Sequence, residues 1–109
     1  MFDFKRISVQ QAKDMIDAGA VTLIDIRDEA SFQAGHMINS IHVDHHSVQG
    51  FIQDADLDIP LVVCCYHGNS SQSAAQFFIE KDFNDVYSLD GGYSDWCVKY
   101  PELCAAANE

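Results

Sequence analysis

The stretch Leu61-Val-Val-Cys-Cys-Tyr-His-Gly-Asn-Ser-Ser71 decides the fold of this chain. Its first half is an apolar run after Pro60, which is typical of a strand buried on both faces. Its second half has no hydrophobic period and a central glycine, and helically spaced apolar residues follow directly. We therefore expect a buried strand, a tight loop and a helix, with Cys65 at the carboxyl end of the strand.

The segments on either side alternate between strand-like and helix-like patterns. Ser8 and Gln11 form a capping-box pattern ahead of a helix that Gly19 ends. We expect further helices over residues 28–34, 47–55 and after Gly92, and strands over residues 21–26, 41–43 and 86–89. This alternation predicts a parallel sheet with helices on both faces. Sites in such sheets lie beyond the carboxyl ends of strands, which is where Cys65 is expected.

Length and charge limit the possible functions. At 109 residues, of which 48% are hydrophobic, the chain is expected to form one domain over residues 1–109. With 6 Lys+Arg against 17 Asp+Glu, the formal net charge is −11. Such acidity disfavours nucleic acid and anionic membrane surfaces as partners. An anionic substrate must therefore be held by local groups, because the overall field repels it.

The four cysteines indicate free thiols. Cys64 and Cys65 are adjacent, Cys97 and Cys104 belong to no motif, and no C-x-x-C is present, so neither a disulfide framework nor a zinc knuckle is expected. Strand alternation places Cys64 on the opposite side of the chain from Cys65, in the core. The N-terminus lacks the apolar region of a signal peptide, and no apolar run is long enough for a membrane span. We expect a reducing, cytoplasmic location.

The loop after Cys65 predicts a reactive thiolate. Its backbone N–H groups can surround the sulfur, and the following helix adds the positive end of its dipole. Both favour the thiolate, so the pKa of Cys65 should be depressed, and the same groups should hold an anion there. The alternative is a buried structural thiol. We expect Cys65 to be catalytic and the loop to bind substrate through Tyr66, His67, Gly68, Asn69, Ser70 and Ser71.

Two chemistries suit such a thiolate. Cysteine phosphatases and arsenate reductases need an arginine six residues after the nucleophile, but Ser71 follows Cys65 at that spacing and Ser70 follows Cys64. The short loop leaves room for a small group such as one extra sulfur. Sulfur transfer through a persulfide is therefore favoured. A module that carries sulfur or binds a partner with little turnover is the remaining alternative.

Four motifs together resemble those of single-domain rhodaneses, which are thiosulfate sulfurtransferases. They are Leu23-Ile-Asp-Ile-Arg27, Phe32-Gln-Ala-Gly-His36, the Cys65 loop and Asp90-Gly-Gly-Tyr-Ser-Asp-Trp96. The resemblance implies a five-stranded parallel sheet and a persulfide on Cys65. It implies thiosulfate or a similar donor, with cyanide or a thiol such as a thioredoxin-like dithiol as acceptor, and no cofactor. Many such enzymes carry basic residues near the loop, whereas this chain has only His67, so weak affinity for thiosulfate is expected.

Other polar residues have structural interpretations. Asp25 and Arg27 suit either an oxyanion clamp or an internal ion pair, and we favour the ion pair, with Glu29 as another possible partner for Arg27. His36 belongs to a structural turn in the family motif. The four histidines between residues 36 and 46 are dense enough to suggest a metal site, but only His42 with His45 or His46 has helical spacing and the stretch begins as a strand, so no metal is expected. Asp90-Gly91-Gly92 is interpreted as a turn, and Trp96 as core or pocket wall.

Overall fold

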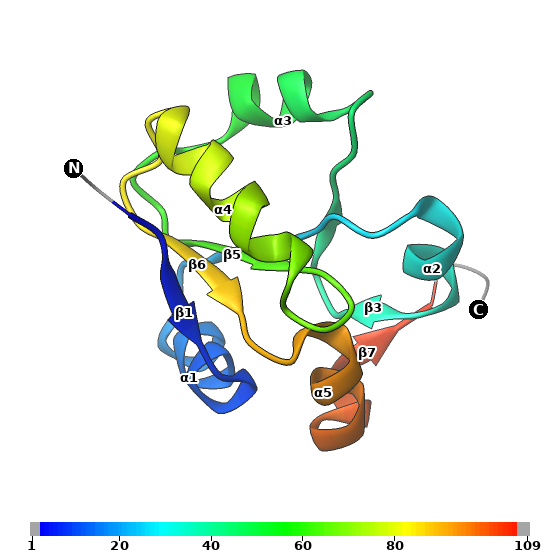
Figure 1. Ribbon diagram of the computed structural model, residues 1–109. Coiled ribbons are helices and arrows are strands. Elements are labelled where there is room, and N and C mark those ends of the chain that lie inside the picture. Colours follow the sequence, from blue (N-terminus) through cyan, green and yellow to red (C-terminus); the bar gives the residue numbers. More distant parts are fainter. Residues whose placement is uncertain (1–2, 107–109) are drawn as a thin grey trace.

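A five-stranded parallel sheet forms the centre of the computed structural model, which describes residues 3–106 (Figure 1). The strand order is β1-β6-β5-β2-β4, and every neighbouring pair is parallel. The strands are β1 (Lys5–Ile7), β2 (Thr22–Asp25), β4 (Ile41–His42), β5 (Leu61–Cys64) and β6 (Val86–Leu89). The predicted α/β architecture is confirmed, and the most apolar strand, β5, is the central one.

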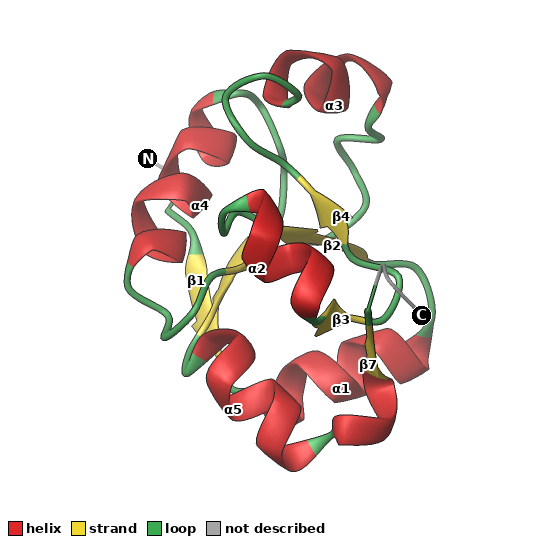
Figure 2. Cartoon of the chain, turned by 90° about the vertical axis from the view of Figure 1, so that its right-hand side faces the viewer, coloured by secondary structure: helices red, strands yellow, loops and turns green. Residues whose placement is uncertain are grey.

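Helices cover both faces of the sheet (Figure 1). On one face lie α1 (Val9–Ala18) and α5 (Gly92–Lys99), and on the other lie α3 (Val48–Asp54) and α4 (Ser70–Glu80). The short α2 (Glu29–Ala34) follows β2 and lies beside β3 (Figure 2). The expected capping box of α1 is present, since Ser8 Oγ accepts from the Gln11 N–H at 3.1 Å and Gln11 Oε1 from the Ser8 N–H at 2.9 Å.

Strand alternation divides the core into two clusters. Residues Leu23, Val62 and Cys64 face α1 and α5, where Trp96 is completely buried. Their neighbours Leu61 and Val63 face α3 and α4, where they pack in one cluster with Ile24, Val86, Ala75 and Phe78. Burial on both sides explains why β5 is apolar at every position.

Four elements were not predicted from the sequence. The edge strand β1 pairs with β6, although two of its three residues are exposed. A small antiparallel ribbon joins β3 (His36–Met37) to β7 (Cys104–Ala105), and a 3-10 turn, Pro101–Leu103, precedes β7. Cys104 therefore lies opposite Met37 in a sheet. In the part of the chain that is described, no helix has the length and apolar character needed to span a membrane.

Candidate functional site

Cys65 lies at the carboxyl end of β5, at the start of a loop that leads directly into α4. Its Sγ accepts hydrogen bonds from the backbone N–H groups of Gly68 at 3.2 Å and Ser71 at 3.3 Å. Gly68 has a φ of +91°, a region in which side chains are strained. This turn lets both N–H groups point at one sulfur. The expectation that backbone N–H groups of the loop point at the Cys65 sulfur is confirmed.

These donors control the ionisation of Cys65. Burial raises the pKa of its thiol, but hydrogen bonds from the Ser71 side chain and from the N–H groups of Ser71, Gly68 and His67 outweigh burial. The pKa of Cys65 therefore lies below its ordinary value, as predicted. A lowered pKa increases the thiolate fraction at neutral pH, and the thiolate is the nucleophilic form.

The neighbouring Cys64 has a different environment. Its side chain packs in the core cluster that contains Trp96, with 1% of its surface exposed. Burial raises the pKa of Cys64 well above its ordinary value, and the charge of Asp25 raises it further. Cys64 is thus a core residue, as predicted.

A second chain segment, at the start of α5, packs against the backbone of the Cys65 loop. The N–H of Tyr93 donates to the Cys65 carbonyl at 2.8 Å, and the N–H of Ser94 donates to the Tyr66 carbonyl at 3.0 Å. Gly92, with a φ of +58°, lies so close that an added Cβ would be 2.4 Å from the Cys65 oxygen. The sequence pattern predicts only a turn here. The Gly91-Gly92 pair at the end of β6, the strand beside β5, was the available signal.

Asp25 and Arg27 form the expected internal ion pair. Arg27 Nε lies 2.9 Å from Asp25 Oδ1 and Arg27 Nη2 lies 2.7 Å from Asp25 Oδ2, with both side chains buried. Nη2 also donates to the Gly35 carbonyl at 2.6 Å, which ties the end of β2 to the end of α2. The partner of Arg27 is Asp25, not Glu29.

Arg27 also orders the wall of the site. Its guanidinium lies against the rings of Tyr66 and Tyr93, at 5.0 Å and 4.3 Å from the ring centroids. The Tyr66 hydroxyl donates to Ser31 Oγ at 2.5 Å, which directs this side chain toward α2. Tyr66 and Arg27 line two adjacent cavities of about 300 and 490 Å³, and Cys65 opens into the smaller one. Cys97 lines the larger cavity. The smaller cavity is called the sulfur pocket below.

The family follows from comparison of the whole chain with known proteins. A family model described as a rhodanese-like domain matches residues 8–99. This chain belongs to the rhodanese-like family. It is 57% identical over 98 residues to a protein named thiosulfate sulfurtransferase GlpE from Pseudomonas aeruginosa strain LESB58, covering 90% of this chain and 88% of the relative. A protein of the same name from Ectopseudomonas mendocina is 52% identical and covers 100% and 99% of the two chains.

Solved structures agree on the fold of this rhodanese-like domain. A rhodanese-like domain protein from Staphylococcus aureus superposes with a TM-score of 0.75 at 16% identity, over 85% of this chain and 91% of that one. A rhodanese-related protein from Thermoplasma volcanium gives a TM-score of 0.74 at 25% identity, over 88% and 93%. The five-stranded sheet is therefore the family's fold.

The predicted binding residues divide into two groups. Tyr66, His67, Asn69 and Ser70 line the sulfur pocket with Cys65, whereas Gly68 and Ser71 contact the sulfur through their N–H groups. Ser71 is buried, and its hydroxyl pairs with Ser88 Oγ at 2.7 Å. Ile26 and Asp28, which were not predicted from the sequence, complete the pocket wall after β2.

The histidines have local partners. His36 Nδ1 lies 2.7 Å from the Phe32 carbonyl, and its ring stacks on Phe32, consistent with a structural turn. His42 Nε2 lies 2.6 Å from the Arg27 carbonyl, and His67 Nδ1 lies 3.0 Å from Ser94 Oγ. Within residues 3–106, no three His, Cys, Asp or Glu side chains are grouped to hold a metal ion.

Proposed function

We propose that this rhodanese-like domain is a sulfurtransferase that takes a sulfane sulfur from thiosulfate, or a similar donor, and passes it to cyanide or a thiol through a persulfide on Cys65. The observation that carries the proposal is Cys65 Sγ, with its lowered pKa, held by two backbone N–H groups at a small pocket. Relatives over nearly the whole chain bear the name thiosulfate sulfurtransferase.

The proposed reaction has two displacements at sulfur. The Cys65 thiolate attacks the outer sulfur of thiosulfate, the S–S bond of thiosulfate breaks, and sulfite leaves with the electron pair. The outer sulfur remains on Cys65 as a persulfide anion. Cyanide or a thiolate then attacks this sulfur, and Cys65 Sγ leaves as the thiolate. Each step exchanges one bond to sulfur for another, so this chemistry requires no cofactor.

Backbone dipoles hold the negative charge in this proposal. The N–H groups of Gly68 and Ser71 stabilise the thiolate between turnovers, and the sulfur pocket accommodates a small sulfur-containing anion. The remaining loop residues, Tyr66, His67, Asn69 and Ser70, bind it along the wall. Arg27 is held by Asp25, so its main contribution is to position Tyr66.

The wider setting is also part of the proposal. We assign the whole chain, residues 1–109, to one rhodanese-like domain, and a thioredoxin-like dithiol is the proposed protein acceptor. All four cysteines are free thiols, which supports a reducing, cytoplasmic compartment.

Mass spectrometry of the thiosulfate-treated protein tests the function. We expect a gain of one sulfur on the peptide that contains Cys65 and its loss on addition of cyanide. Cys65→Ser should acquire no sulfur, and Cys97→Ser is the matched control that should still acquire it. Sulfur mapped to another cysteine, or full turnover by Cys65→Ser, would refute the proposal. Labelling without steady-state turnover would instead identify a sulfur carrier.

A further inference from the structure

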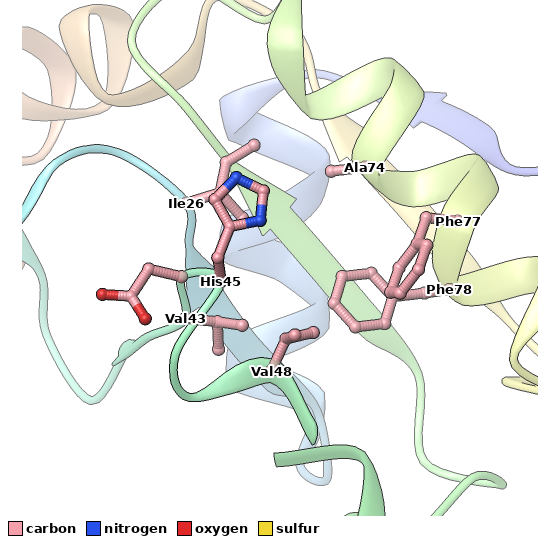
Figure 3. Close-up of a pocket in the computed structure, with 8 residues that line it drawn as sticks. Ile26, Val43, His45, Val48, Ala74, Phe77 and Phe78 are labelled. Carbon is pink, nitrogen blue, oxygen red and sulfur yellow. The ribbon is translucent and has the colours of Figure 1, made fainter. Parts of the chain in front are cut away.

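A third pocket, drawn in Figure 3, lies on the face of the sheet covered by α3 and α4 and shares Ile26 with the sulfur pocket. Its volume is about 310 Å³. Figure 3 shows Phe77 and Phe78 on α4 forming one wall, with the His45 ring beside Ile26 on the other side. The apolar lining residues are Ile26, Val43, Val48, Ala74, Phe77 and Phe78. We call it the apolar pocket.

Two elements connect the apolar pocket to the sulfur pocket. Ile26, at the end of β2, lines both, and its N–H donates to the carbonyl of Cys64 at 3.0 Å. Along α4, Ser70 lines the sulfur pocket and Ala74 lines the apolar pocket. Residues four apart share one helix face and are separated by about one turn, roughly 5.4 Å. A compact molecule can therefore have its sulfur in one pocket and its substituent in the other.

We propose that the apolar pocket binds the substituent of a small organic thiol acceptor, R–SH, in which R is a compact, uncharged aryl or branched-alkyl group. The proposal rests on the sulfurtransferase function and names the class of acceptor that this site selects. The volume of the pocket, at the lower end of the range for ligand sites, limits R to a compact group.

The charges around the apolar pocket favour an uncharged substituent. The described lining contains no Lys or Arg, and Asp44 contributes a carboxylate to it. The chain also carries a net charge of −11. A carboxylate on R would therefore be repelled, whereas an apolar R covers Phe77, which is 39% exposed.

The transfer step balances without another reactant. The acceptor thiolate, RS⁻, attacks the outer sulfur of the Cys65 persulfide and forms a new S–S bond. The bond between this sulfur and Cys65 Sγ breaks, and Sγ leaves with the electron pair. The products are RSS⁻ and the Cys65 thiolate, which again accepts hydrogen bonds from Gly68 and Ser71.

Single-turnover discharge of the persulfide tests the selectivity. Protein loaded with thiosulfate and desalted is mixed with phenylmethanethiol, 2-mercaptoethanol, mercaptoacetate or cyanide, and loss of the sulfur is followed by mass spectrometry. At equal thiolate concentration, we expect phenylmethanethiol to discharge it at least tenfold faster than 2-mercaptoethanol, and mercaptoacetate to be the slowest thiol. Equal rates for the three thiols would overturn the proposal.

Variants of the apolar pocket test whether this pocket causes the preference for phenylmethanethiol. Ala74→Phe fills the apolar pocket and Phe77→Ala removes one wall at a partly exposed position, so the second variant is informative if the first fails to fold. Each variant's phenylmethanethiol rate, divided by its own cyanide rate, should fall about tenfold. Val98→Phe, at an 81% exposed site on α5, should keep the wild-type ratio. An unchanged ratio in both pocket variants would overturn the proposal.

Two further experiments distinguish failure of the pocket proposal from failure of the proposed sulfurtransferase function. Benzyl alcohol, which cannot react, should bind to Cys65→Ser and shift the amide resonances of Ala74, Phe77 and Phe78 in NMR spectra, and Ala74→Phe should abolish these shifts. This result does not depend on sulfur transfer. Absent shifts would therefore refute ligand binding in the apolar pocket, whereas failure of thiosulfate to form the persulfide would refute the sulfurtransferase function. Phenylmethanethiosulfonate, a sulfur donor with the same aryl group, tests whether the pocket binds the donor instead. If Ala74→Phe slows persulfide formation from this donor but does not slow persulfide discharge to phenylmethanethiol, the pocket binds the donor and the acceptor proposal is wrong.

Discussion

Cys64 and Cys65 are adjacent in the chain, but their thiols lie in opposite environments. Cys64 packs among apolar side chains on the α1 and α5 face, and burial raises the pKa of its thiol. Cys65 lies past the strand, where burial also acts against the thiolate but hydrogen bonds from the loop outweigh it. Burial raises the pKa of both thiols, and the hydrogen bonds from the loop make the pKa of Cys65 alone fall below its ordinary value.

The largest expected effect is on alkylation of the folded protein. Iodoacetamide should modify Cys65 at least about 1,000-fold faster than Cys64, because Cys64 reacts only when the fold opens and opening typically costs 5–15 kcal/mol. Peptide mapping over time gives both rates, and in denaturing urea they should become similar. Comparable rates in the folded protein would show that the two thiols do not differ as described.

Asp25, whose charge acts on Cys64, should contribute chiefly to stability. Asp25→Asn leaves the buried Arg27 guanidinium without its carboxylate, so the free energy of unfolding should fall by about 3–5 kcal/mol. Urea denaturation measures the change. The control is Asp17→Asn, which breaks the surface pair between Lys13 and Asp17 and should leave the denaturation midpoint almost unchanged. Similar midpoints for the two variants would contradict the structural role of Asp25.

Gly92, which packs against the backbone of Cys65, should affect both the stability of the fold and the rate of sulfur transfer. An added Cβ would meet the backbone oxygens of Cys65 and Tyr66 at 2.4 and 2.6 Å, and the φ of +58° strains any side chain. Gly92→Ala should cost about 1–3 kcal/mol of stability, and displacement of the loop should slow sulfur transfer at least about tenfold.

Gly50→Ala is the matched control for Gly92→Ala. Gly50 lies within α3 and has open space around it, so the substitution should stabilise the protein by about 0.5–1 kcal/mol. If both alanine variants behave alike in denaturation and transfer assays, the contact between Gly92 and the loop has no role.

The pH dependence of Cys65 reactivity should respond to Ser71. Only the thiolate reacts, so the alkylation rate rises with pH and levels off above the pKa, which in wild type lies below the ordinary cysteine value. Ser71→Ala removes a side-chain hydrogen bond that lowers this pKa, so the curve should move to higher pH. Ser73→Ala, on the exposed side of α4, should leave the curve in place. A shift to lower pH in Ser71→Ala would contradict the assignment.

The smallest expected effect concerns thiosulfate affinity. Asn69 lines the sulfur pocket and its side chain makes no capping hydrogen bond, so Asn69→Lys adds a positive charge without removing such a contact. The KM for thiosulfate should fall by about two- to fivefold at low salt, and the effect should fade as salt screens the charge. Steady-state kinetics with Asn69→Gln separates charge from size. An effect independent of salt would mean that charge is not its cause.

Local patterns predicted much of the molecule. The Ser8 and Gln11 cap, the apolar run of β5 and the loop that begins at Cys65 depend on neighbouring residues, which the sequence displays directly. The opposite burial of Cys64 and Cys65 follows from strand geometry and the position of the loop. The short edge strand β1 was missed because its three residues carry no recognisable period and are defined by pairing with β6.

The sequence by itself determined the fold class, the position of Cys65 at the end of the central strand and the direction of its pKa shift, because strand, loop and helix start are consecutive. Only the tertiary structure placed Gly92 and Tyr93 against the backbone of the Cys65 loop. It also placed Arg27 against the rings of Tyr66 and Tyr93, and the apolar pocket beside the sulfur pocket. These contacts join segments that are distant in sequence and meet only where the parallel strands end together. Their geometry depends on strand order and packing, which local propensities do not encode.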